Sequence, residues 1–110
     1  MNIVGSVKNK NCVIVDDIID SGGTIVNAVN ALKEKGAKDV YVYVTHAVLS
    51  GEAIHKIEKS KIKKLITTDT IDNSKKIVIS KKIEIISLAP IISEAMKRIA
   101  NSTSVSSLFK

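Results

Sequence analysis

A run of acidic, hydroxyl and glycine residues between positions 16 and 24 holds the side chains best suited to chemistry in this 110-residue chain. The run reads Asp16, Asp17, Ile18, Ile19, Asp20, Ser21, Gly22, Gly23 and Thr24. Glycines let a backbone approach an anion without a Cβ in the way, and the two hydroxyls can donate hydrogen bonds to anionic oxygens. The run therefore predicts a loop that grips a phosphate group.

The three carboxylates in the run indicate that the ligand offers more than a phosphate. Asp16 and Asp17 fall at the carboxyl end of an apolar run, where ligands of open α/β sheets bind. Side chains that only accept hydrogen bonds suit ligand hydroxyls, a bound cation, or both. A sugar phosphate with a metal ion fits this mixture. The alternative, an ordinary turn rich in aspartate and glycine, requires all these residues to coincide directly after an apolar run.

The elements on either side of the run are those that a phosphate-binding loop needs. Residues 13–15 are β-branched and predict a buried strand in the middle of a parallel sheet. A helix is expected directly after the loop, because apolar residues recur at helical spacing until Gly36: Ile25, Ala28, Val29 and Leu32. The N-terminus of that helix would add roughly half a positive charge beside the loop.

The rest of the chain alternates between strand and helix patterns. Ranges 2–7, 40–44, 65–68, 77–79 and 83–86 are β-prone, and 83–86 is a better strand candidate than 77–79. A second helix is expected from Ser50 as its N-cap, with Glu52 in its first turn and a buried side made of Ala53, Ile54 and Ile57. A third begins at Pro90 and would bury Ile92, Ala95, Met96 and Ile99.

This alternation predicts an α/β fold: one domain over residues 1–110, with a parallel sheet covered by helices on both faces. The carboxyl ends of parallel strands lie together, so His46 and Asp69 should reach the same rim as Asp16 and Asp17. For His46 two readings stay open. It could bind a phosphate or contribute to a contact between subunits, or it could form a hydrogen bond with a neighbouring carbonyl in a turn.

Composition narrows the classes of partner. The formal charge of +6 comes from lysines scattered over turns and polar helix faces, and only three aromatic residues are present, so the pattern does not predict nucleic-acid binding. No apolar run approaches the roughly 20 residues that cross a bilayer, and no signal peptide is visible, so we expect a cytoplasmic protein without membrane contact. The lone Cys12 should pack as a small reduced hydrophobe.

The run around the loop resembles the phosphoribosyl-diphosphate binding loop shared by type I phosphoribosyltransferases and ribose-phosphate diphosphokinase (phosphoribosyl-pyrophosphate synthetase). Pieces on both sides of it resemble the diphosphokinase in particular. These pieces are residues 1–5, 45–51, 68–71, 87–90 and 104–109. They follow one another in the family's order over nearly the whole chain, but they resemble only the C-terminal part of that enzyme.

The resemblance implies a phosphoribosyltransferase-like (Rossmann-like) three-layer domain, incomplete relative to the family. It implies that Asp16 and Asp17 hold the ribose hydroxyls and an associated Mg²⁺, with Asp16 taking part in catalysis. The residues that would wrap the 5-phosphate of ribose 5-phosphate are Asp20, Ser21, Gly22, Gly23 and Thr24. The implied reaction moves the diphosphoryl group of ATP to the sugar, giving phosphoribosyl diphosphate and AMP.

The family's ATP-gripping residues, its metal-binding histidine and its catalytic mobile loop all lie before the region that this chain resembles. ATP would therefore be bound by residues outside the chain, in a homo-oligomer or in an assembly with the N-terminal half of the enzyme. A chain that opens directly on a strand also agrees with truncation. Two alternatives stay open: a non-catalytic subunit that assembles with an intact enzyme through Leu108 and Phe109, and a minimal phosphoribosyltransferase.

Overall fold

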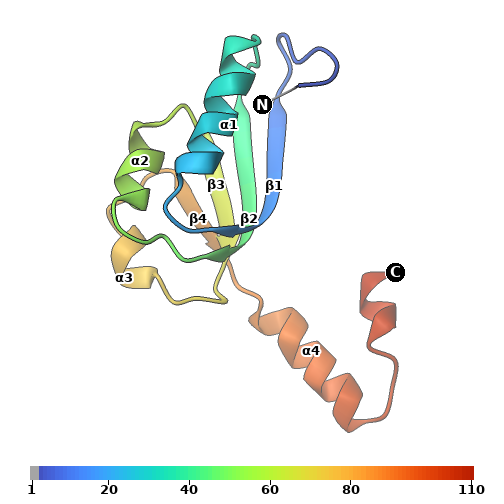
Figure 1. Cartoon of the computed structure of the whole chain (residues 1–110). Coiled ribbons are helices and arrows are strands. Elements are labelled where there is room, and N and C mark those ends of the chain that lie inside the picture. Colours follow the sequence, from blue (N-terminus) through green and yellow to red (C-terminus); the bar gives the residue numbers. More distant parts are fainter. Residues whose placement is uncertain (1–2) are drawn as a thin grey trace.

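The computed structural model describes residues 3–110, and its centre is a four-stranded parallel sheet with strand order β1-β2-β3-β4 (Figure 1). The strands are β1 (Cys12–Ile19), β2 (Val40–Ala47), β3 (Lys64–Thr68) and β4 (Ile83–Ile86). The helices are α1 (Gly23–Glu34), α2 (Ala53–Lys59), α3 (Ser74–Ile77), α4 (Ala89–Ala100) and a 3₁₀ turn, η1 (Ser106–Phe109). Strands and helices alternate along the chain, as the sequence predicted.

An aliphatic core fills the space between the sheet and helices α1 and α2. Val40, Val42 and Leu65 project into it from the two central strands, while Val29 and Ile57 meet them from the helices, and all five are fully buried. The predicted buried side of the second helix is confirmed, since Ala53 and Ile54 are buried with Ile57. Cys12 packs against the edge of this core.

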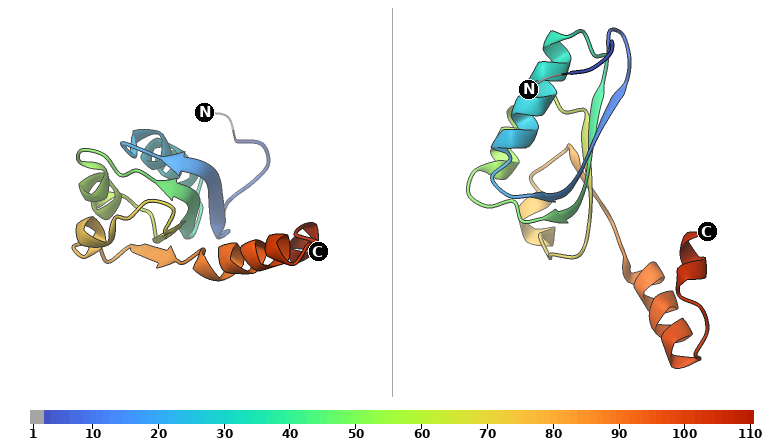
Figure 2. Two further views of the ribbon diagram at one scale, coloured as in Figure 1. Left: turned by 90° about the horizontal axis from the view of Figure 1, so that it is seen from below. Right: turned by 45° about the vertical axis from the view of Figure 1, so that its right-hand side comes forward.

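The second layer of helices that the sequence led us to expect is not found among residues 3–110. Helices α1, α2 and α3 lie on one face of the sheet, and α4 extends away from the sheet (Figures 1 and 2). The opposite face leaves Val13, Val15, Tyr43 and Ile86 exposed. Strand β1 lies at the edge of the sheet, so the expectation of a buried middle strand at residues 13–15 was wrong.

Four local expectations also differ from the structure. The apolar stripe of α4 is exposed. Residues 3–7 form no strand, and Asn2 lies outside the described residues. Of the two β-prone ranges, the favoured one, 83–86, forms β4, whereas 77–79 is not a strand because a short helix, α3, occupies residues 74–77. Helix α2 has Glu52 as its N-cap rather than Ser50, since the Ser50 hydroxyl is engaged elsewhere.

Within residues 3–110 no helix combines the length and the apolar character that crossing a bilayer requires.

Candidate functional site

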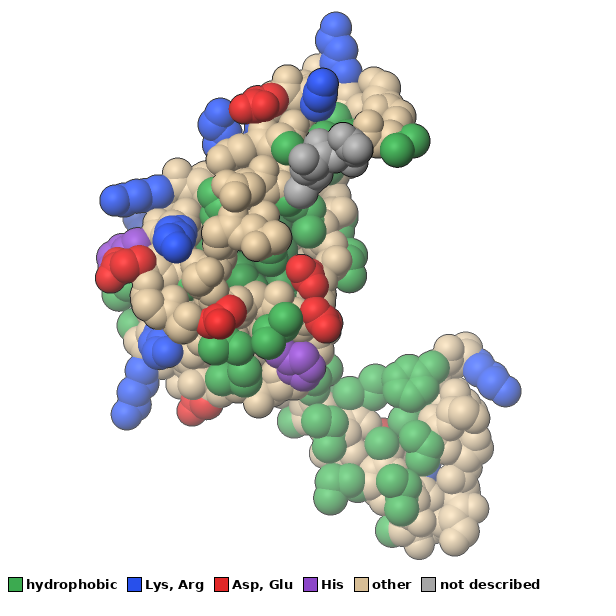
Figure 3. All heavy atoms as spheres, viewed as in Figure 1, with side chains coloured by type: hydrophobic (Ala, Val, Ile, Leu, Met, Phe, Trp, Pro, Cys, Tyr) green, Lys and Arg blue, Asp and Glu red, His purple; other side chains and the backbone are tan. Residues whose placement is uncertain are grey.

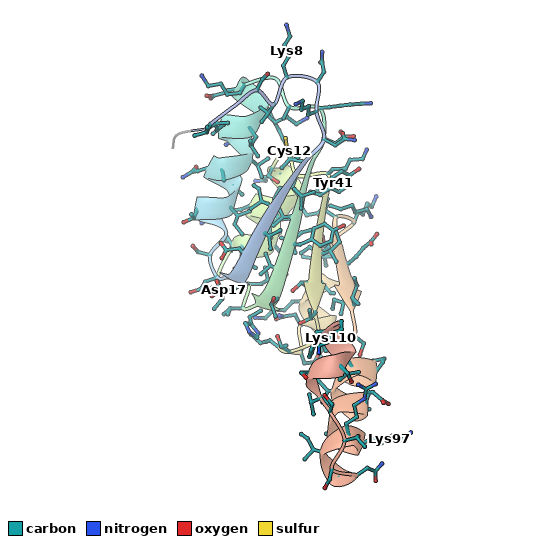
Figure 4. All side chains as sticks on the ribbon, turned by 90° about the vertical axis from the view of Figure 1, so that its right-hand side faces the viewer. Lys8, Cys12, Asp17, Tyr41, Lys97 and Lys110 are labelled. Carbon is teal, nitrogen blue, oxygen red and sulfur yellow. The ribbon has the colours of Figure 1, made fainter. Side chains whose placement is uncertain are left out.

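The predicted loop lies at the carboxyl end of β1, where the strand turns into α1. The strand is longer than its apolar run indicated, because Asp16 and Ile18 still pair with Val44 and His46 of β2. The two aspartates are therefore strand residues, and adjacent strand residues point to opposite faces. In Figure 4, Asp17 lies at the end of β1 away from Lys8 and Cys12.

A pocket of about 240 Å³ opens beside this loop. Its lining residues are Asp16, Ile18, Ile19, Asp20, Ser21, Gly22, Thr24 and Ile25. The structure thus brings five of the seven predicted site residues to one pocket, whereas Asp17 and Gly23 do not line it. Acidic side chains and a histidine come close together on the surface shown in Figure 3, at the end of the sheet nearest α4.

The loop turns into α1 through a left-handed residue. Gly22 is the N-cap, with φ of 87°, a conformation that costs little only for glycine. Gly23 begins the helix, and a Cβ placed there would meet nothing within 4 Å, so the space in front of it is open. This is the backbone geometry in which a chain can approach an anion closely.

The first turn of α1 is open to an acceptor from outside the helix. Among residues 3–110 no side chain caps this helix, and its first turn carries no acidic residue. The first N–H groups of a helix lack intrahelical partners, and the helix dipole makes that end attractive to negative charge. The pocket therefore combines a helix N-terminus, two hydroxyls and the carboxylate of Asp16.

The loop that connects β2 to α2 braces this turn. The carbonyl oxygen of Ile19 accepts hydrogen bonds from the N–H groups of Val48 (2.9 Å) and Leu49 (3.4 Å), and the carbonyl of Asp20 accepts one from Ser50 (3.1 Å). The Ser50 hydroxyl also donates to the carboxylate of Asp20. In this structure Asp20 consequently positions the loop, a role that the sequence did not reveal.

A metal ion bound at this rim would take most of its coordinating oxygens from the substrate and from water. Among the described residues no three His, Cys, Asp or Glu side chains are grouped to hold a metal. Mg²⁺ is usually held by one or two carboxylates together with substrate oxygens and water, so it needs no such group. Asp16, which is exposed at the strand end and lines the pocket, fits that kind of shared coordination, whereas Asp17 points to the opposite face of the strand and does not line the pocket.

A second hollow, of about 200 Å³, lies next to the first on the uncovered face of the sheet. Its lining comes from all four strands and includes Asp16 together with Val15, Tyr43, Val44, Thr45, Ile66, Thr67, Thr68 and Ile86. Asp16 is the residue common to both hollows. The sequence predicted Asp16 as a site residue, but it did not predict the apolar hollow beside it.

Threonines at the ends of β2 and β3 link the two strands beside the site. The Thr68 hydroxyl donates to the carbonyl of Thr45 (2.6 Å), and Nδ1 of His46 lies 2.9 Å from the Thr70 hydroxyl. His46 is therefore bonded to a side-chain hydroxyl, so of the two open readings the structural one holds in this structure, with a threonine in place of the carbonyl. The sequence did not single out Thr45, Thr68 or Thr70 for these contacts, although their positions near the carboxyl ends of two predicted strands were visible.

Asp69 reaches the rim but turns toward α4. Its carboxylate accepts hydrogen bonds from the Leu88 N–H (2.8 Å) and the Ser87 hydroxyl (2.6 Å). These two bonds, the Leu88 N–H first, lower the pKa of Asp69 below its usual value. Asp69 thus fixes the junction between the sheet and α4.

Comparison with known proteins agrees with this geometry. Residues 1–110 match the model of the phosphoribosyl synthetase-associated domain. The chain is similar to the ribose-phosphate pyrophosphokinase of Clostridium tetani, with 55% identity over 109 residues, which make up 99% of this chain and 34% of the relative. It is also similar to the enzyme of the same name from Hyphomonas neptunium, with 51% identity over 99% of this chain and 35% of the relative.

A solved structure shares the fold. The crystal structure of phosphoribosylpyrophosphate synthetase from Mycobacterium smegmatis superimposes with a TM-score of 0.81 and 37% sequence identity. The match covers 90% of this chain and 33% of the other chain. The present chain therefore spans about a third of the length of the relatives that it matches.

Proposed function

Since this chain belongs to the phosphoribosyl synthetase-associated domain family, we propose that it supplies the ribose 5-phosphate-binding part of a ribose-phosphate diphosphokinase. One observation carries the proposal: a left-handed Gly22 opens the uncapped N-terminus of α1 onto a pocket that also holds the carboxylate of Asp16. An anion-binding helix end and a hydrogen-bond acceptor for hydroxyls, side by side, suit a phosphorylated sugar.

Each site residue has a role in this proposal. The 5-phosphate lies at the N-terminus of α1, where the backbone N–H groups and the hydroxyls of Ser21 and Thr24 donate to its oxygens. Asp16 accepts from the ribose hydroxyls, and Asp20 keeps the loop in place through Ser50. Gly22 and Gly23 allow the backbone to approach the phosphate.

The proposed reaction transfers diphosphate from ATP to the sugar and forms phosphoribosyl diphosphate and AMP. Transfers of this kind depend on positioning and on neutralising charge at phosphoryl oxygens. Mg²⁺ supplies part of that neutralisation when it is bound, and Asp16 would hold it together with substrate oxygens, while Asp17 could join only if the end of β1 turns its side chain toward the pocket. ATP is bound by residues outside this chain, in a homo-oligomer or in an assembly that supplies the rest of the enzyme, and the setting is the cytoplasm.

Two other functions are compatible with the family. A non-catalytic subunit would bind an intact enzyme without turnover of its own. A minimal phosphoribosyltransferase would release diphosphate in a reaction that depends on a nucleobase. Formation of AMP from ATP in the presence of ribose 5-phosphate distinguishes the proposed activity from both alternatives.

Calorimetry with ribose 5-phosphate and Mg²⁺ tests the proposed site directly. Thr24→Val removes one hydroxyl donor to a charged oxygen, so we expect about tenfold weaker binding, and Asp16→Ala should weaken binding by a similar factor. Ser74→Ala, at an exposed serine outside the pocket, is the control and should bind like the wild type. Equal affinity in all four proteins would exclude the loop as the sugar phosphate site.

A further inference from the structure

The face of the sheet opposite α1 and α2, here the open sheet face, presents apolar side chains to solvent. Val15, Tyr43 and Ile66 lie in one row across three strands, since the strand register pairs Val15 with Tyr43 and Tyr43 with Ile66. Val15 is 78% exposed, and Ile86 continues the apolar surface on β4. Parallel sheets are normally covered on both faces, so this surface is expected to have a partner.

Helix α4 presents a second uncovered apolar surface, here the α4 stripe. Ile92, Met96 and Ile99 recur at helical spacing on one side of the helix, and Met96 is 65% exposed. No residue of α4, which the structure describes completely, is buried. Hydrophobic side chains accordingly cluster over this helix in Figure 3.

Hydrogen bonds of Asp69 fix the start of α4, and those of Arg98 fix the turn that follows the helix. At its start, Asp69 binds Ser87 and Leu88. At its other end, Arg98 forms an ion pair with Glu94 (3.0 Å) and donates to Ser107 and to the carbonyl oxygen of Ser104, which ties the final turn back onto the helix. The α4 stripe therefore stays exposed and does not cover the sheet of its own chain.

The size of the uncovered surface is that of a stable interface. The chain exposes 7337 Å², whereas a compact monomer of 11.9 kDa would expose roughly 5,900 Å². Its radius of gyration is 16.6 Å, against about 13 Å for a compact domain of this length. The difference in area exceeds the roughly 800 Å² that each partner buries in a standard interface.

The comparisons indicate the partner. The part of each relative that this chain does not match is about twice as long as the part that it matches. The fold of 90% of this chain is the same as in the longer Mycobacterium smegmatis protein. A second copy of this chain fits less well, because each copy carries a formal charge of +6, and like net charge opposes self-association.

We propose that the open sheet face and the α4 stripe together form the docking surface for the part of a ribose-phosphate pyrophosphokinase chain that this chain does not span. The partner presents apolar surface to both, and the covered sheet acquires its missing layer. The inference rests on the proposed function and adds the partner through which that function is completed.

Co-expression tests this docking surface. The Clostridium tetani relative, with its 109 matching residues deleted, is expressed with the tagged full-length present chain, and the tag is used for purification. We expect the two chains to purify together in equal amounts. Val15→Asp and Met96→Asp should each reduce recovery of the deleted relative at least tenfold, because each places a charge in an apolar contact.

Val78→Asp is the matched control. Val78 is also 78% exposed, but it lies beside α3, away from both surfaces, so this variant should recover as much partner as the wild type. Circular dichroism of each purified variant checks that its helix and strand content is unchanged. An insoluble deleted relative, or recovery that is the same for all variants, would overturn the proposal. A homodimer of the present chain that Val15→Asp disrupts would overturn it in favour of a second copy.

Docking and sugar binding can fail separately. Thr24→Val should leave co-purification unchanged while weakening ribose 5-phosphate binding. If the wild-type chain captures the deleted relative but binds no ribose 5-phosphate, the proposed function fails and the docking surface stands. If it binds the sugar phosphate but captures no partner, the docking inference fails alone.

Discussion

At the scale of single residues, the site depends more on backbone conformation than on the chemistry of any one side chain. Gly22 adopts φ of 87°, and the two hydroxyls beside it are positioned only because the chain turns there into α1. Asp16 lines both hollows at the rim from within the last half of β1. The chemistry of the loop is therefore set by one unusual backbone angle.

Gly22→Ala should lower the free energy of unfolding by about 1–2 kcal/mol, because a Cβ makes the left-handed conformation costly. The measurement is urea unfolding followed by circular dichroism. Gly23→Ala is the control: no atom lies within 4 Å of the added methyl, so its stability should stay within about 1 kcal/mol of the wild type. Equal losses in the two variants would show that the left-handed angle is not the cause.

The ionisation of Asp69 should control the start of α4. Hydrogen bonds from Leu88 and Ser87 lower the pKa of Asp69, so they favour the folded junction above the ordinary aspartate pKa of about 3.9. The stabilisation is lost as the pH falls through the lowered value. We expect the Leu88 N–H to stay protected from hydrogen exchange at pH 5 in the wild type and to lose protection in Asp69→Ala. Equal exchange in the two proteins would contradict this role.

At the scale of elements, α2 and the segment before β4 are joined by one carboxylate. Glu58 accepts hydrogen bonds from the Ser80 hydroxyl and from the N–H groups of Lys81 (3.1 Å) and Lys82 (3.2 Å). The Ser80 bond is the largest cause of the lowered pKa of Glu58, and burial partly opposes it. This contact places the edge strand β4 relative to a helix on the covered face.

Glu58→Ala should destabilise the fold by about 1–2 kcal/mol, since it leaves the Lys81 N–H and the Ser80 hydroxyl without their acceptor and removes one of the two acceptors of the Lys82 N–H. The loss should appear at pH 7 and shrink toward pH 3, because the carboxylate contributes only when it is ionised. Urea unfolding at both pH values measures it. Glu34→Ala is the control, because Glu34 is exposed and lies at the end of another helix, α1. A loss that does not depend on pH would assign the effect to packing.

Helical periodicity predicted which side of each helix is apolar, but not what covers it. Ile25 and Val29 of α1 are buried as predicted, whereas Ile92 and Met96 of α4 repeat the same spacing and remain exposed. The spacing of apolar residues shows that one side of the helix is hydrophobic. Which segment or protein covers that side depends on the tertiary arrangement. For the same reason the sequence could not show that Ser50 supports Asp20 instead of capping α2.

At the scale of the whole molecule, the parallel α/β order was predictable because strands and helices alternate, and the site followed because strand ends meet at one rim. The uncovered face was not predictable. The β-branched residues 13–15 look the same in a sequence whether a central strand or an edge strand carries them. What distinguishes the two cases is how many strands and helices surround them.

The carbonyl oxygen of Ile19 accepts hydrogen bonds from N–H groups of the loop after the adjacent strand. Two segments of the rim are therefore joined by bonds between main-chain atoms. Hydrogen bonds between main-chain atoms do not depend on which side chains the residues carry. Divergence among relatives can therefore change the amino acids of either segment, within the limits of the left-handed turn, while the outline of the cavity persists. Ligand binding in this family would then depend mainly on the conformation of the backbone, and individual substitutions would adjust the affinity.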